Sequence, residues 1–263
     1  MIEQVQSKVR ELLEAGTIQG FLGLREQNGH IAPHLFQDPT DLEGMSLGDR
    51  ERPGDARYPL TKILLTLTGN DSRAKLGILV RGCDERALES LAAWNQLDRD
   101  KVVPVGIACP RELAEECECE RPYPKDPVAG EKTEPVAFAS VSRIEEMEPS
   151  ERMRYWLREF DKCVKCYGCR DICPVCFCRE CSLEDQYLIR TRNLPPENPV
   201  FHLTRAVHMA GRCIDCGLCE QVCPAEIPLR TLYKKVGQIM EDEFSYHTGE
   251  TTGKPPLQIA DGE

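Results

Sequence analysis

The chain has 263 residues with 41% hydrophobic and 29% charged side chains, a length and composition that allow two globular domains with separate cores. A formal net charge of −11 excludes the Lys and Arg excess with which nucleic-acid-binding proteins neutralise phosphate. No apolar stretch approaches the roughly 18 residues of a membrane span, and the N-terminus has no apolar signal core. We therefore expect a cytoplasmic protein without a membrane span and without a nucleic-acid partner.

The first 109 residues alternate helical and strand-like patterns, which predicts an α/β domain. Val5, Val9 and Leu12 recur at helical spacing, and 76–80 is an apolar run typical of a buried strand. The predicted elements are, in chain order, a helix ending at Gly16, a strand over 18–24, a helix over 59–67, a strand over 76–80, a helix over 84–97 and a strand over 102–108. The last three predict a parallel crossover unit.

Prolines and charged residues accumulate from Glu120 to Ser150, which favours irregular backbone and a connection between domains. Helices are predicted beyond it over 151–160 and 200–210. The predicted organisation is a first domain over 1–130, a linker over 131–150, a second domain over 151–245 and a tail over 246–263.

Most of the 15 cysteines lie in the second domain, and an intracellular chain is expected to use so many thiols for metals. Cys163 to Pro174 and Cys213 to Pro224 both read C-x2-C-x2-C-x3-C-P, at an offset of 50 residues. This spacing predicts two 4Fe-4S clusters that exchange their fourth ligands. One set is Cys163, Cys166, Cys169 and Cys223, and the other is Cys213, Cys216, Cys219 and Cys173. Two structural zinc sites are the alternative.

The region carrying these two motifs resembles the bacterial-type two-cluster ferredoxins. The resemblance implies an α+β dicluster domain and one-electron transfer. His202 and His208, in the segment between the motifs, are expected to be ordinary helix packing or surface residues.

Three further cysteines, Cys176, Cys178 and Cys181, directly follow the first motif. They are one thiolate short of a cluster, so a further cluster would need a histidine, an aspartate or a partner's residue as its fourth ligand. Free or redox-active thiols are the alternative.

The first domain holds the remaining four cysteines, Cys83, Cys109, Cys117 and Cys119. Cys83 and Cys109 each follow a predicted strand, so neighbouring parallel strands would bring both to one edge of the sheet. The pair Cys117 and Cys119 is close enough in sequence to fold back onto them. A third 4Fe-4S cluster is the preferred interpretation, with a zinc site or unligated cysteines as alternatives.

This order of strands and cysteines, followed by Asp126-Pro127-Val128-Ala129-Gly130, resembles the β-subunit family of deazaflavin-coenzyme-reducing hydrogenases and dehydrogenases. The resemblance implies one 4Fe-4S cluster, FAD, and assembly with the catalytic and electron-transfer subunits of an anaerobe's redox complex. This chain departs from the family by lacking a Gly-rich turn before Gly16, and no G-x-G-x-x-G follows a strand.

Two functions follow from these patterns. The first is a non-catalytic iron–sulfur subunit that relays single electrons in a formate dehydrogenase, hydrogenase or heterodisulfide-reductase type of complex. It is preferred because no nucleophile and base pair or open metal site is visible in the sequence. The alternative is a flavin-containing subunit that reduces a deazaflavin or a similar hydride acceptor.

Overall fold

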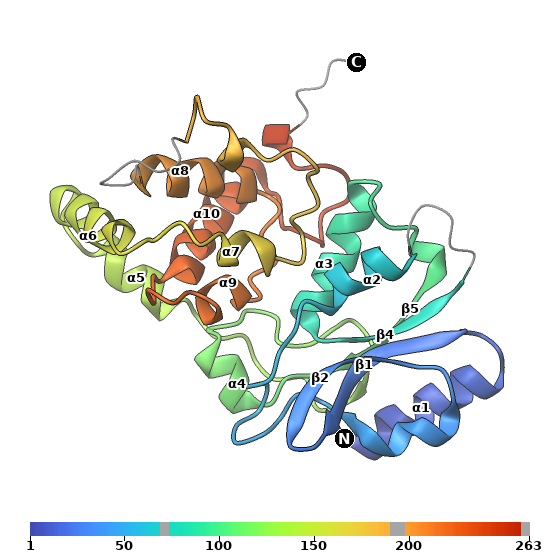
Figure 1. The fold of residues 1–263 in the computed structure, drawn as a ribbon. Coiled ribbons are helices and arrows are strands. Elements are labelled where there is room, and N and C mark those ends of the chain that lie inside the picture. Colours follow the sequence, from blue (N-terminus) through green and yellow to red (C-terminus); the bar gives the residue numbers. More distant parts are fainter. Residues whose placement is uncertain (69–73, 190–197, 259–263) are drawn as a thin grey trace. The chain divides into compact units, whose positions relative to one another are not determined.

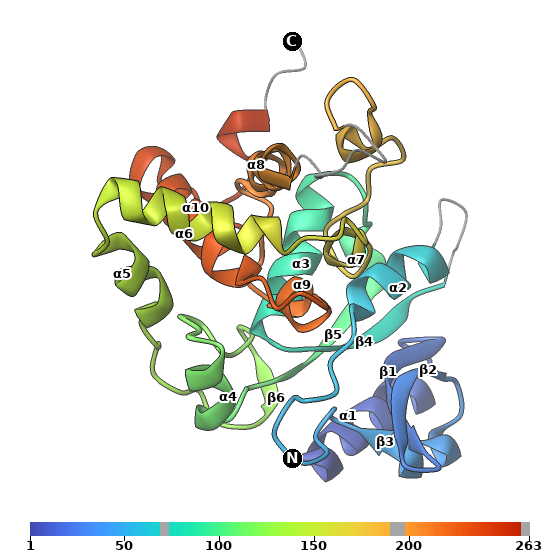
Figure 2. The same ribbon diagram turned by 60° about the vertical axis from the view of Figure 1, so that its left-hand side comes forward.

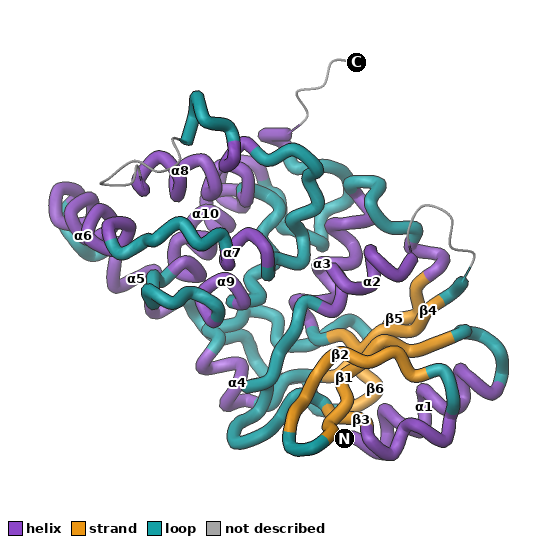
Figure 3. The backbone as a smooth tube through the Cα atoms, viewed as in Figure 1, coloured by secondary structure: helices purple, strands orange, loops and turns teal. Residues whose placement is uncertain are grey.

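The computed structural model describes residues 1–68, 74–189 and 198–258 (Figure 1). The chain divides into two compact units, Met1–Ala137 and Phe138–Glu263, and each is described by itself. Figure 3 shows that the strands belong to the first unit, whereas the described part of the second is built from helices and loops.

The first unit alternates strands and helices, as the sequence pattern predicts. Its elements are α1 (Ile2–Glu14), β1 (Gly20–Gln27), β2 (His30–Phe36), η1 (Pro39–Gly44), β3 (Met45–Ser46), α2 (Leu60–Thr68), β4 (Leu76–Val80), α3 (Gly82–Ala93), η2 (Arg99–Lys101), β5 (Val102–Ile107), α4 (Arg111–Glu116) and β6 (Pro127–Ala129). Helix α3 ends earlier than predicted, and Asn95 just beyond it adopts a positive φ of 54° that reverses the chain.

The sheet has the strand order β2-β1-β4-β5-β6, with β3 paired to β1. Strands β1, β4, β5 and β6 are parallel neighbours, and β2 and β3 run antiparallel to β1. Helix α1 covers one face of this sheet and α2 and α3 cover the other (Figures 1 and 2). The parallel pairing of β4 with β5 through α3 is the predicted crossover unit.

Strand β2 was not predicted from the sequence, because Pro33 interrupts its apolar pattern. Proline is tolerated there because β2 lies at the edge of the sheet. The dipeptide Asn28-Gly29 is a signal that could have revealed it. Both residues have positive φ, 54° and 74°, as a two-residue hairpin turn between β1 and β2 requires.

The core of the first unit is formed where these helices meet the sheet. The residues that α1 buries are Val5, Val9 and Leu12, as its helical spacing predicts. All five residues of β4 are buried, because helices cover both faces of a central parallel strand. The carboxyl ends of β4 and β5 therefore carry the segments that follow them to the same edge of a rigid sheet.

The second unit consists of α5 (Ala139–Glu145), α6 (Pro149–Asp161), α7 (Gly168–Asp171), η3 (Ser182–Glu184), α8 (Asn198–Met209), α9 (Leu218–Gln221), α10 (Leu229–Phe244) and η4 (Pro256–Gln258). Helix α5 lies inside the segment predicted as a linker and packs against α10. The α+β class expected for this unit needs correction, because its described residues contain no strand. Each cysteine motif contains a one-turn helix, α7 in the first and α9 in the second, which leaves the loops no extended segment to pair.

Helix α8 packs against α6 and α10 in the second unit, and the two one-turn helices α7 and α9 contact each other. The predicted bounds of α8, 200–210, agree closely with the observed helix. No helix in the described part of the chain has the length and hydropathy that a membrane span requires.

Candidate metal centres

The two cysteine motifs of the second unit have the same backbone conformation at the same offset of 50 residues. Lys165 and Tyr167 have positive φ of 49° and 61° in the first loop, and Asp215 and Gly217 have positive φ of 55° and 74° in the second. Each loop then enters its one-turn helix. The duplication seen in the sequence is therefore a duplication of loop geometry.

The first thiol set combines cysteines from both motifs. Burial raises the pKa of Cys163, and the neighbouring thiols of Cys166 and Cys223 raise it further. Burial likewise raises the pKa of Cys169, despite the opposing charge of Arg205, with Cys163, Cys166 and Cys223 adding to the effect. The Lys165 backbone N–H also donates a hydrogen bond to Cys163 Sγ at 3.4 Å. Cys223, which ends the second motif, thus lies among the thiols of the first.

The second thiol set mirrors the first. Burial is the largest cause that raises the pKa of Cys213 to about 12, and the charges of Asp215 and Cys216 contribute to the same rise. Burial, Cys216 and Cys213 raise the pKa of Cys219. The Cys176 thiol and burial raise the pKa of Cys173, and Cys216 is among its further neighbours. Cys173, which ends the first motif, thus lies next to the second.

The chemistry of each donor set fits an iron–sulfur cluster, because its thiols lie near enough to interact electrostatically, and all of them except Cys166 are buried or partly buried. Metal binding would release protons from these thiols, as it does whenever thiols become thiolate ligands, and the raised pKa values of Cys163, Cys169, Cys173, Cys213 and Cys219 favour the protonated form before the metal binds. Within the described residues, no three His, Cys, Asp or Glu side chains converge as ligands of one metal ion. A cluster differs from such a single-ion site because each of its cysteine ligands binds a different iron.

Helix α10 holds the second loop through Asp215. Arg230 Nε lies 2.7 Å and Lys234 Nζ 3.1 Å from the two carboxylate oxygens of Asp215, and Arg230 Nη2 also donates to its backbone carbonyl at 2.7 Å. The Lys234 side chain is only 2% exposed. A charge pair so well shielded from water constrains the loop much more than a surface pair would.

Helix α8 holds the first loop. Asn198 Nδ2 donates to the carbonyl of Cys163 at 3.0 Å, and Arg205 Nη2 donates to the carbonyl of Cys169 at 2.7 Å. His202 lies between them on the helix and stacks on Phe160, with ring centroids 4.5 Å apart. Burial and the charge of Arg205 lower the pKa of His202 to about 4, so it packs as a neutral ring. This is the packing role expected from its place in a helix.

The three cysteines after the first motif each interact with a different arginine. Arg205 Nη1 lies 3.6 Å from Cys176 Sγ, and Arg212 Nη1 lies 3.6 Å from Cys178 Sγ. The Cys181 thiol interacts with Arg170.

Two of the four cysteines of the first unit, Cys117 and Cys119, lie in the segment 117–123, and the backbone at the other two approaches this segment. Cys83 is in the first turn of α3 directly after β4, and Cys109 follows β5. Cys109 packs with Cys117 and Cys119 around Leu113, and its backbone N–H donates to the Pro122 carbonyl at 2.7 Å.

Gly82 brings the start of α3 close to the same segment. A Cβ at this position would lie 2.5 Å from the Arg121 carbonyl oxygen and 2.7 Å from that of Tyr123. Only glycine therefore allows the backbone next to Cys83 to approach the segment that Cys109 contacts.

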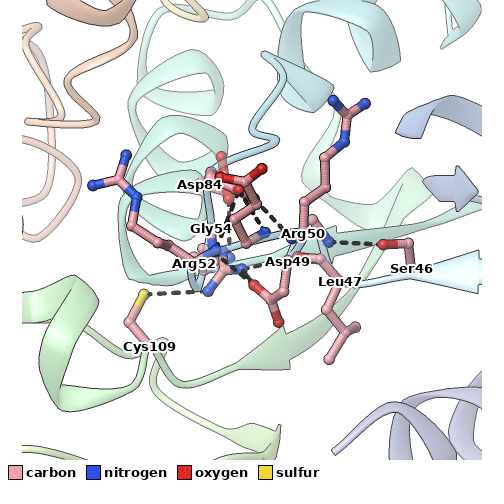
Figure 4. A network of polar contacts seen from close by, with 12 residues as sticks. Ser46, Leu47, Asp49, Arg50, Arg52, Gly54, Asp84 and Cys109 are labelled. Atoms are coloured by element: carbon pink, nitrogen blue, oxygen red, sulfur yellow. Dashed lines mark hydrogen bonds and ion pairs between the residues drawn. The ribbon is translucent and has the colours of Figure 1, made fainter. Parts of the chain in front are cut away.

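Arg81 was missed by sequence reasoning, although it stands between a strand and Gly82-Cys83. It is 7% exposed, and it donates from Nη1 to Cys109 Sγ at 3.7 Å and from Nη2 to the Leu47 carbonyl at 2.9 Å. Figure 4 shows the surrounding polar network, which includes Asp49 and Asp84. Burial raises the pKa of Cys109, whereas the charge of Arg81 opposes that rise. The network thus places a buried cation against a candidate metal ligand.

Comparisons with known proteins agree with the second unit's geometry. Residues 162–228 match the family model of the 4Fe-4S dicluster domain. The chain is 40% identical to the F420-dependent formate dehydrogenase subunit beta of Methanocaldococcus jannaschii over 114 residues, which are 43% of this chain. Over 113 residues it is 44% identical to the F420-dependent formate dehydrogenase 1 subunit beta of Methanococcus maripaludis.

The matched segments span 30% and 28% of these two relatives. The comparisons confirm the predicted resemblance to the dehydrogenase β-subunits and the predicted dicluster iron–sulfur domain. Residues 162–228 are therefore a 4Fe-4S dicluster domain, in a chain related to the beta subunits of F420-dependent formate dehydrogenases.

Proposed function

We propose that this chain is an electron-transfer subunit of a multi-subunit oxidoreductase, relaying single electrons between a catalytic subunit and a second redox partner. The observation that supports the proposal is the exchange of fourth cysteines between the motifs: Cys223 lies among the first set and Cys173 beside the second. Such an exchange is typical of two-cluster ferredoxins. The names of its relatives make formate dehydrogenase the preferred type of complex.

Two ligand sets would hold the clusters of the dicluster domain: Cys163, Cys166, Cys169 and Cys223, and Cys213, Cys216, Cys219 and Cys173. The clusters would supply one-electron redox chemistry, at potentials that in proteins range from about −700 to +450 mV. The protein's own residues hold the thiols close together, limit water access and donate hydrogen bonds to sulfur, as the Lys165 N–H does to Cys163.

A third cluster in the first unit is part of the proposal, with Cys83, Cys109, Cys117 and Cys119 as its ligands. It is supported by the common sheet edge of Cys83 and Cys109 and by the packing of Cys109 against Cys117 and Cys119. Zinc is the alternative occupant.

Cys176, Cys178 and Cys181 are proposed to remain as thiols and not to form a fourth cluster. Their contacts with three separate arginines favour this interpretation over a shared site. A fourth cluster completed by a ligand from elsewhere is the alternative, and the iron content of the chain distinguishes the two.

The flavin-containing alternative keeps its support from the names of the relatives, which are F420-dependent enzymes. It assigns the chain FAD and hydride transfer to a deazaflavin. Stoichiometric flavin in the purified chain would favour it over the relay.

The decisive experiment measures iron, sulfide, zinc and flavin per chain after anaerobic purification, with EPR spectra of the dithionite-reduced protein. Three clusters correspond to about twelve irons, two to about eight and four to about sixteen. A colourless protein that contains zinc and no iron would refute the proposal.

The exchange of ligands is tested with Cys223→Ser and Cys173→Ser, each of which should remove the signal of one cluster and about four irons. Cys178→Ser is the matched control, because Cys178 is an exposed thiol outside both sets. Full iron content in both ligand variants would contradict the assignment.

A further inference from the structure

We propose that Arg205 is a positioning residue that holds a permanent positive charge between the two thiol sets and raises the reduction potentials of both clusters. The inference rests on the proposed function, because it concerns the clusters that the two sets would bind. It adds a specific determinant of their potentials.

The geometry places the Arg205 guanidinium against the first motif and the cysteine that follows it, and its charge reaches cysteines of both thiol sets. Nη2 donates to the carbonyl of Cys169, a first-set cysteine, at 2.7 Å, and Nη1 approaches the Cys176 thiol at 3.6 Å. The charge of Arg205 also acts on the second-set thiols Cys173 and Cys219, opposing the rise of their pKa values. One side chain therefore contacts or faces cysteines of both sets.

The side chain is held in this place by the surrounding protein. Arg205 is 3% exposed, and its guanidinium carbon lies 5.8 Å from the centre of the Tyr233 ring of α10. Helices α8 and α10 pack against each other, which limits the positions that both side chains can occupy.

One donor of Arg205 has no partner among the residues that the structure describes. Its Nε is buried and makes no hydrogen bond to any described residue. A buried donor that is left unpaired is costly, so its presence needs an explanation. Cluster or thiolate sulfur is an acceptor of the required kind, and hydrogen bonds to sulfur are known to raise cluster potentials.

Charge explains the expected direction. Each reduction adds one negative charge to a cluster, and a nearby buried cation stabilises the reduced state more than the oxidised one. Arginine stays protonated in proteins, so this stabilisation does not depend on pH. A surface arginine would have little effect, because water and salt screen it.

The test uses the full chain, purified anaerobically, with redox titrations followed by EPR. Arg205→Gln and Arg205→Met remove the charge, and Arg205→Lys keeps it. Arg158→Gln, which removes the same charge from an exposed position of α6 in the same unit, is the matched control. The iron and sulfide content of every variant is measured before its potential.

Both neutral variants are expected to keep their iron and to show at least a tenfold lower equilibrium constant for reduction of each cluster. This corresponds to a shift of about 59 mV to more negative potential for one electron. Arg205→Lys should recover at least half of the shift, and Arg158→Gln should show none.

Unchanged potentials in an iron-replete neutral variant would overturn the inference while leaving the proposed function intact. Loss of iron from both neutral variants would make Arg205 a folding residue and would overturn it as well. Absence of clusters from the unmodified chain would instead refute the proposed function, and the inference with it.

Discussion

Replacing Asp215 with asparagine removes one negative charge from the second cysteine loop with little change in shape. Asparagine tolerates the positive φ of 55° at this position. The carboxylate it replaces accepts from Arg230 and from Lys234, whose side chain is 2% exposed. Breaking a buried charge pair typically costs about 3–5 kcal/mol, because the partner charge stays in the protein interior.

The expected loss of stability is smaller than that full range. The Asp215 side chain is 20% exposed, Arg230 keeps its bond to the Asp215 carbonyl, and Lys234 Nζ keeps its place 3.9 Å from the centre of the Phe138 ring. We therefore expect the free energy of unfolding to fall by about 2–3 kcal/mol. Anaerobic denaturant unfolding of proteins with equal iron content measures this difference.

The internal repeat supplies the control. Lys165 occupies the equivalent position of the first loop, with a positive φ of 49°. Lys165→Asn should change the free energy of unfolding by no more than about 0.5 kcal/mol, as most substitutions near a surface do. Equal effects of Asp215→Asn and Lys165→Asn would refute the reasoning that α10 holds the second loop through a buried charge pair.

Two further predictions concern His202 and glycine packing. Because the pKa of His202 is lowered to about 4, its contribution to stability is complete above the unfolded value of about 6.5 and is lost as the pH falls toward 4. Between pH 7.5 and pH 5.5 the chain should lose about 1.4 kcal/mol through this group, and His202→Phe, compared by denaturant unfolding at both pH values, should not show that loss. Gly82→Ala should destabilise the chain by about 1–3 kcal/mol, because its Cβ would lie 2.5 Å from a backbone oxygen. Gly237 lies inside α10, and a Cβ at this position would meet nothing within 4 Å, so Gly237→Ala should stabilise the chain by about 0.5–1 kcal/mol. Thermal unfolding measures both glycine variants. A lower melting temperature for Gly237→Ala than for Gly82→Ala would contradict the conclusion that only Gly82 is closely packed against backbone.

The sequence predicted the features that depend on local spacing. The periodicity of Val5, Val9 and Leu12 predicted α1, and the apolar run 76–80 predicted β4 with its observed bounds. The two C-x2-C-x2-C-x3-C-P motifs predicted the dicluster domain that the family model matches over 162–228. These features can be predicted from sequence because the helix period, the burial of a strand and the ligation of a cluster each impose a characteristic residue pattern along the chain.

Strand β2 and helix α5 escaped prediction for a different reason. Pro33 makes β2 unfavourable anywhere except at a sheet edge, and its edge position depends on the order of the whole sheet. Helix α5 lies among prolines and charges, and it packs against α10, which begins more than 80 residues later. Tertiary packing overrides local propensity in both places.

Only the tertiary structure brought the arginines to the cysteines. Arg81 reaches Cys109 across 28 residues of sequence, and Arg205 reaches the carbonyl of Cys169 across 36. An arginine in a sequence is usually read as a surface residue, because burying its charge is costly unless partners are present. Those partners come from other elements of the fold. The cysteine spacing therefore determined which thiols are candidate ligands, whereas helix and sheet packing decided which buried charges surround them.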